Sequence, residues 1–130
     1  SAIKSLKSLA NKENVNLNAL EKDIFSIDSD FFETFDYVIE QTCFCAIHPS
    51  LRSDYEELIK KILKPYGKLI GLWFPLDKPI NEGGPPYGTT IKEVKRFFNI
   101  GWKTIREEFS NFSVDSRIGR EKLIIFQKVI

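Results

Sequence analysis

The sequence predicts an α/β fold with a mostly parallel sheet that ends in an antiparallel hairpin. Short apolar segments suited to strands alternate along the chain with segments whose apolar residues follow helical spacing. The last two strand-like segments follow each other with no helix between them, which favours a hairpin at the carboxyl end. With 130 residues, the chain is long enough for one domain with its own core and too short for two.

Three elements are predicted in the amino-terminal part of the chain. A helix capped by Ser1 is expected because the apolar residues that follow have helical spacing: Ile3, Leu6, Leu9 and Ala10. Val15–Leu20 alternates weakly between apolar and polar residues, which predicts a short strand. Residues Asp28–Phe32 are expected to form a single turn.

The centre of the chain carries the clearest strand, helix, strand pattern. Phe35–Ile39 is a short apolar run of the kind that forms strands covered on both faces. A helix capped by Ser50 follows, with a buried stripe expected from Tyr55, Leu58, Ile59, Ile62 and Leu63. Pro65 and Gly67 end it, since proline cannot continue a helix and glycine tolerates positive φ. Lys68–Phe74, KLIGLWF, is then the strongest strand.

A loop rich in proline and glycine, Pro75–Thr89, follows that strand. It is long for a structureless connection, which favours either a functional lid or disorder. Thr90 is predicted to cap a helix from Ile91 to about Phe98. The hairpin strands are expected at residues 101–109 and 122–128.

Composition and charge exclude several classes of function. Nineteen basic residues nearly balance eighteen acidic ones. The net charge of +1 therefore gives no sign of electrostatic binding to nucleic acid or to an anionic membrane. No apolar run approaches the ~18 residues of a membrane span. Two cysteines do not make a disulfide scaffold, so we expect a soluble protein in the reducing cytoplasm. His48 is the only histidine, and no metal site is expected around it.

Four segments carry motifs that are specific in combination. They are FDYVIEQTCFCAIHP at 35–49, SLRSDYEELIKKILKPYGKLIGLWFPL after it, GGPPYG at 83–88 and GREKLIIF at 119–126. In this order and spacing they resemble the thiopurine and thiol methyltransferase family, over nearly all of the chain. The resemblance implies a Rossmann-like fold, S-adenosylmethionine as cofactor and a small-molecule acceptor, with a thiol or related sulfur nucleophile preferred. An inert fragment or scaffold of the same fold is the alternative.

Two features of that family are absent from residues 1–130. The family begins with a glycine-rich turn after its first strand, and an acidic residue that ends the second strand binds the ribose hydroxyls. The resemblance therefore implies that the whole chain, 1–130, is the carboxyl-terminal portion of one methyltransferase domain, inactive alone. In the family's sheet the missing strands lie between Val15–Leu20 and Phe35–Ile39, so both segments are expected to present unpaired apolar edges.

The cofactor residues implied by the resemblance follow strands, where ligands lie in open α/β sheets. Asp23 and Ile24 would flank adenine, with the carboxylate accepting from the exocyclic amine; Asp23 as a simple turn or cap residue is the alternative. Gln41 and Thr42 follow the next strand and would contact the cofactor there. Many family members carry arginine at the position of Gln41.

The acceptor side is assigned by the same resemblance to six residues: Phe44, Trp73, Pro85, Pro86, Tyr87 and Arg117. Trp73 in the core is an equal alternative, and Arg117 and Arg120 are equally well explained as surface residues. Cys43 and Cys45 favour packing over redox chemistry, because one residue separates them instead of two. No catalytic acid or base is identified, which suits a thiol acceptor that ionises partly near neutral pH. Neither the acceptor nor an oligomeric state follows from the sequence.

Overall fold

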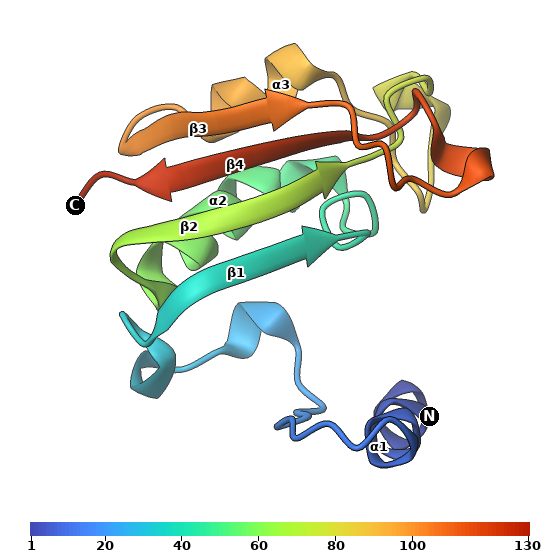
Figure 1. The fold of residues 1–130 in the computed structure, drawn as a ribbon. Coiled ribbons are helices and arrows are strands. Elements are labelled where there is room, and N and C mark those ends of the chain that lie inside the picture. The colour runs from blue at the N-terminus through green and yellow to red at the C-terminus, as the bar shows by residue number, and fades with distance from the viewer.

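The computed structural model describes residues 1–130 and contains a four-stranded sheet with helices on one side (Figure 1). In chain order the elements are α1 Ala2–Lys12, β1 Phe35–Gln41, α2 Arg52–Ile62, β2 Leu63–Trp73, α3 Ile91–Phe97, β3 Trp102–Glu108 and β4 Lys122–Lys128. The sheet order is β1-β2-β4-β3, with β1 and β2 parallel and β4 antiparallel to both β2 and β3. Three strands therefore point the same way, and β3 and β4 form the predicted hairpin. The α/β prediction is confirmed.

The core lies between the sheet and the two helices α2 and α3, which Figure 1 shows behind it. Its buried residues come from every one of these elements: Phe44, Tyr55, Ile59, Ile62, Leu63, Leu69, Trp73, Val94, Phe98, Trp102, Ile124 and Phe126. On the opposite face Ile39, Ile70 and Ile125 are aligned across three strands. No helix lies in front of this face in Figure 1.

The prediction that Phe35–Ile39 is covered on both faces is wrong. β1 forms the outer edge of the sheet and pairs only with β2. Tyr37 is 58% exposed and Ile39 is 78% exposed, because nothing packs on their face of the strand. The expected unpaired, apolar edge is therefore present at β1.

The predicted strand at Val15–Leu20 is absent. The segment has no strand partner and lies apart from the sheet, at the lower side of Figure 1. A β-strand is stabilised by backbone hydrogen bonds to a neighbouring strand, and no strand lies beside this segment. The preceding helix α1 does form, with Ser1 accepting from the backbone N–H of Lys4 at 3.2 Å. It buries only Ala10.

The start of α2 differs from the prediction that Ser50 caps it. A 3-10 turn, Pro49–Leu51, precedes the helix, and His48 caps that turn through Nδ1, which accepts from the backbone N–H of Ser50 at 3.2 Å. Proline suits the first helical position because its missing N–H would have no partner there. The helix ends at Ile62, so Leu63, Pro65 and Gly67 belong to β2.

Two classes of feature are absent from the described residues. No helix combines the length and the apolar composition that a membrane crossing requires. No group of three or more His, Cys, Asp or Glu side chains is placed to hold a metal ion.

Replacing Thr90 with alanine is expected to lower the free energy of unfolding by about 1 kcal/mol. Thr90 caps α3, with its hydroxyl oxygen accepting from the backbone N–H of Glu93 at 3.1 Å. Urea denaturation of the chain measures the loss. Ser1→Ala is the control, because it removes the corresponding cap from α1, which contributes little to the core; an equal loss in both variants would contradict the expectation.

Candidate functional site

Three loops meet at the carboxyl ends of β1 and β2. Tyr87, in the loop after β2, donates its backbone N–H to the carbonyl of Cys45, in the loop after β1, at 2.8 Å. Leu76 donates its backbone N–H to the carbonyl of Arg120, just before β4, at 2.9 Å. Since the carboxyl ends of parallel strands lie at one edge of a sheet, this is where an open α/β fold binds its ligand.

Glu40 fixes the loop that follows β1. Its side chain is 3% exposed, and Oε1 accepts from the backbone N–H groups of Cys43 at 3.1 Å and Phe44 at 2.9 Å. Its other oxygen accepts a hydrogen bond from the Tyr55 hydroxyl on α2. Burial, with the Glu40 carboxylate adding to it, raises the pKa of Tyr55, so the phenol stays protonated and remains a donor.

Gln41 and Thr42 lie exposed at the carboxyl end of β1, as the prediction of cofactor residues requires. Thr42 has φ +61° and donates its hydroxyl to the Gln41 carbonyl at 2.6 Å, which makes the chain turn sharply away from the strand. Both side chains are available to a ligand at this edge.

Arg52 connects α2 to the loop after β2. Its side chain is fully buried; Nη1 donates to the Gly88 carbonyl at 3.1 Å and to Glu93 at 3.2 Å, and Nη2 donates to the Tyr87 carbonyl at 3.3 Å. The guanidinium also lies 4.2 Å from the centre of the Phe44 ring. These contacts fix the end of the Pro75–Thr89 loop and join it to the loop after β1, so the loop is not disordered, and its role as a lid stays a prediction.

Phe44 and Trp73 are not walls of an open cavity. Each is 1% exposed, and their rings meet edge to face with centroids 5.3 Å apart in the core. The prediction that they line an acceptor pocket does not hold in this conformation, because α2 and α3 cover them. For Trp73 the alternative, a core residue, is correct.

The remaining acceptor-side residues lie at the surface of this edge. Pro85 and Pro86 are exposed, and Tyr87 is half-buried with its ring 5.6 Å from that of His48. Arg117 is also half-buried and stacks on Phe74, with its guanidinium carbon 4.5 Å from the ring centre.

Cys43 and Cys45 are both free thiols that belong to the loop after β1. Cys45 is 4% exposed and Cys43 is half-buried. Burial raises the pKa of each thiol, and the nearby Glu40 carboxylate raises it further. Both therefore stay protonated near neutral pH and behave as packing residues.

Asp23 and Ile24 do not share a crevice with Gln41. Asp23 caps a short 3-10 turn, accepting from the backbone N–H of Phe25 at 2.9 Å, which is the alternative that the sequence left open. Ile24 lines an apolar cavity of about 200 Å³ near Phe35, at the amino end of β1. None of the larger cavities joins these residues to Gln41, because their segment pairs with no strand.

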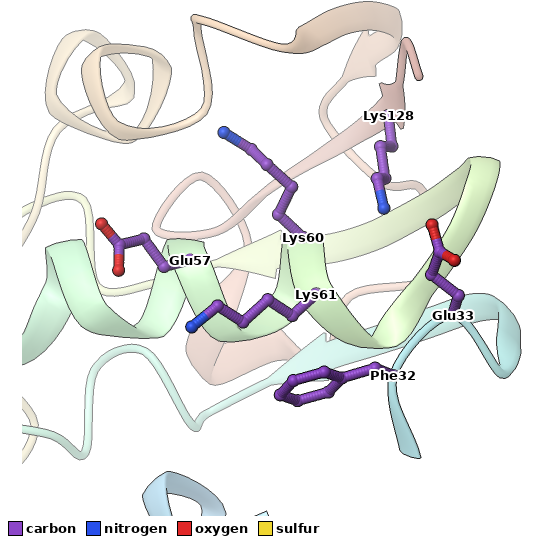
Figure 2. A pocket seen from close by; sticks show the side chains of 6 residues that line it. All are labelled: Phe32, Glu33, Glu57, Lys60, Lys61 and Lys128. Atoms are coloured by element: carbon purple, nitrogen blue, oxygen red, sulfur yellow. The ribbon is translucent and has the colours of Figure 1, made fainter. Parts of the chain in front are cut away.

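The largest cavity, about 450 Å³, lies at the opposite end of the sheet and is lined by Phe32, Glu33, Glu57, Lys60, Lys61 and Lys128 (Figure 2). Figure 2 shows the Lys60 and Lys61 side chains diverging from neighbouring positions on α2. The Lys60 ammonium donates to the Ile100 carbonyl at 3.1 Å, and that of Lys128 donates to the Leu63 carbonyl at 2.9 Å. The cavity lies away from the carboxyl ends of β1 and β2, where an open α/β fold binds its ligand, so it is not part of the candidate site at that edge.

The family model described as thiopurine S-methyltransferase matches residues 2–127. The chain belongs to this family. A probable thiol methyltransferase 2 of Arabidopsis thaliana is 36% identical over 103 residues, which are 75% of this chain and 45% of that protein. A thiocyanate methyltransferase 1 of Brassica oleracea is 32% identical over 109 residues, which are 79% of this chain and 47% of that protein. The chain thus spans less than half the length of these relatives.

Solved structures of methyltransferases share the fold of this family member. A SAM-dependent methyltransferase from Methanosarcina mazei matches with a TM-score of 0.74 and 16% identity, over 99% of this chain and 78% of that one. A 1,6-didemethyltoxoflavin-N1-methyltransferase from Burkholderia thailandensis, solved with S-adenosylhomocysteine, matches with a TM-score of 0.67 and 18% identity, over 96% of this chain and 56% of that one. The Rossmann-like methyltransferase fold predicted from the resemblance is confirmed.

Sequence reasoning missed two residues that organise this site, Glu40 and Arg52, although their spacing carries a signal. Arg52 precedes Tyr55, Ile59 and Ile62 at helical intervals, so it falls on the buried stripe of α2. Glu40 is the one buried residue of β1. A charged residue at an inward-facing position must find partners inside the protein.

Proposed function

We propose that this chain is part of an enzyme that transfers the methyl group of S-adenosylmethionine to a small-molecule sulfur acceptor. The family match over residues 2–127 supports this function, as do two relatives named for thiol and thiocyanate methylation. The meeting of three loops at the carboxyl ends of β1 and β2 is the structural observation that carries it.

The residues at that edge fit the cofactor in part. Gln41 offers an amide that can donate and accept, and Thr42 offers a hydroxyl beside it; both are exposed where β1 ends. S-adenosylmethionine, when bound, supplies a methyl group on a positively charged sulfur. Pro85, Pro86 and Tyr87 would exclude water from the acceptor, and alignment in a dry pocket contributes up to ~7–11 kcal/mol to such a displacement.

We also propose that residues 1–130 form the carboxyl-terminal portion of one methyltransferase domain. The free edge of β1 supports this, since Tyr37 and Ile39 are exposed there without a neighbouring strand. A strand pairing at this edge would complete the sheet beside Gln41. A cytoplasmic location agrees with the two free thiols.

A chimera tests the proposed function, because residues 1–130 can replace the matched part of the Arabidopsis relative. Methyl transfer to a simple thiol is expected from the chimera and not from the 130-residue chain alone. A folded chimera that methylates no thiol, thiocyanate or halide would contradict the proposal, and failure to bind S-adenosylmethionine at millimolar concentration would favour the alternative, an inert scaffold.

Within the chimera, Gln41→Ala is expected to weaken S-adenosylmethionine binding about fivefold, which corresponds to the loss of one hydrogen bond of roughly 1 kcal/mol. Isothermal titration calorimetry measures the dissociation constant. Lys103→Ala is the control, because Lys103 is also exposed but lies on β3. Equal affinities in both variants would remove Gln41 from the cofactor site.

A further inference from the structure

The largest cavity contains a buried lysine that has no counter-charge. Lys128 lines this cavity of about 450 Å³ and is only 8% exposed. Its ammonium donates to the Leu63 carbonyl at 2.9 Å, which uses one of its three N–H donors. Lys128 takes part in no ion pair. A buried charge without an opposite charge is costly, so this ammonium is a strong site for an anionic group.

A carboxylate without a counter-charge lines the same cavity. Glu33 also forms no ion pair, and Figure 2 shows its carboxylate and the Lys128 ammonium pointing towards each other from different elements. Both residues are held at the end of α2, because the backbone N–H of Glu33 donates to the Lys61 carbonyl at 2.9 Å and Lys128 donates to that of Leu63. Two opposite charges that share a cavity without pairing leave room for a ligand between them.

The backbone holds Glu33 in an unusual conformation. Its φ of +53° lies in the left-handed region, which residues other than glycine rarely adopt. Hydrogen bonds on both sides of the residue maintain this conformation, since Glu33 is bonded to Lys61 and the backbone N–H of Thr34 donates to the Ile62 carbonyl at 3.1 Å. Strained backbone of this kind is concentrated at functional sites, where the surrounding contacts maintain it. The fold therefore sets the direction of the Glu33 side chain.

The other lysines of this cavity already have partners within the protein. Lys60 pairs with Glu56 at 3.0 Å, one turn earlier on α2. The Lys61 ammonium lies over the Phe32 ring, 5.9 Å from its centre. The buried ammonium and the carboxylate that faces it therefore remain as the two charges available to a ligand, with an aromatic ring on the cavity wall.

We propose that this cavity binds a free α-amino acid as its zwitterion. The ligand carboxylate accepts from Lys128, its ammonium donates to Glu33, and an apolar side chain lies against Phe32. A simple anion would be repelled by Glu33 and a simple cation by Lys128, whereas a zwitterion gives each of them a charge-assisted hydrogen bond. The cavity volume is within the range of about 300–1,000 Å³ that is usual for small-molecule sites. Since the cavity lies at the opposite end of the sheet from the candidate site, this inference does not depend on the proposed methyl transfer.

L-Leucine is the probe, because two analogues keep its side chain and lack one charge each. Isocaproate lacks the ammonium and isoamylamine lacks the carboxylate. NMR titration of the 130-residue chain, followed through the amides of Glu33, Lys61 and Lys128, gives both the affinity and the location. We expect each analogue to bind about tenfold or more weakly than leucine, because each loses one charge-assisted hydrogen bond. Equal binding by either analogue, or no shift of these amides with leucine, would overturn the proposal.

Glu33→Gln keeps the shape of the side chain and removes its charge. The residue is exposed, so the variant is expected to fold and to bind leucine about tenfold more weakly, with no loss of isocaproate affinity. Glu57→Gln is the matched control, since Glu57 lines the same cavity but Figure 2 shows it at the far end from Glu33, and leucine affinity should be unchanged. An equal loss in both variants, or no loss in Glu33→Gln, would overturn the proposal. No cofactor enters these titrations, so their outcome is independent of whether methyl transfer occurs.

Discussion

Replacing Arg52 with alanine is expected to lower the free energy of unfolding by about 3–5 kcal/mol, the usual cost of removing one partner from a buried ion pair. The fully buried guanidinium satisfies the carbonyls of Tyr87 and Gly88 together with the Glu93 carboxylate. Burial lowers the pKa of Arg52 and Glu93 opposes that shift, so the guanidinium stays charged at neutral pH. Without it, Oε1 of Glu93 and two loop carbonyls lose their donor.

Denaturant unfolding of the chain followed by circular dichroism measures this loss. Arg96→Ala is the control, since Arg96 is an exposed arginine on α3, and a change within about 0.5 kcal/mol is expected there. Arg52→Lys should fall between the two, because an ammonium keeps the charge but cannot span the contacts of the guanidinium fork. Equal midpoints for the Arg52→Ala and Arg96→Ala variants would show that the loop after β2 is held by other contacts.

The order of elements was predictable because each carries its own local signal. Thr90 caps α3, and the KLIIFQK segment forms β4 with the predicted bounds, since cap chemistry and apolar runs act over a few residues. Val15–Leu20 was predicted as a strand and is not one, because a strand depends on a neighbour as much as on its own residues. The same reason leaves Ile39 exposed on a strand whose apolar run predicted burial.

The candidate site was predictable only in part. Gln41, Thr42 and Tyr87 lie at the expected edge because strand ends and the loops after them follow directly from the strand order. Phe44 and Trp73 are in the core, because an aromatic residue beside a strand end has the same pattern whether it faces a ligand or a helix. Arg52 bonds Tyr87, Gly88 and Glu93, which lie at least 35 residues away in the sequence, so no local pattern could reveal its partners.

The second large effect is expected from Glu40→Ala, which should lower the free energy of unfolding by about 3 kcal/mol or more. The substitution leaves three donors without an acceptor, namely the buried N–H of Phe44, the buried Tyr55 hydroxyl and the half-buried N–H of Cys43, and each unpaired buried group costs about 1–3 kcal/mol. Partial entry of water into the loop keeps the total below the sum. The loop that presents Gln41 and Thr42 should loosen at the same time.

Two further variants separate the loop contacts of Glu40 from its contact with α2. Tyr55→Phe removes only the hydroxyl that donates to the buried Glu40 carboxylate, so a loss of about 1.5–3 kcal/mol is expected, with the Cys43 and Phe44 amides still protected from hydrogen exchange. Glu40→Ala should instead expose both amides to exchange. Measurements at pH 7 report the full contribution of Tyr55: its pKa is raised in the fold, so this contribution is complete below the unfolded tyrosine pKa of about 10 and is lost only as the pH rises past the folded value. If both amides stayed protected in Glu40→Ala, another acceptor would have to hold the loop, and Glu40 would lose its role in placing Gln41 and Thr42 at the edge of the sheet.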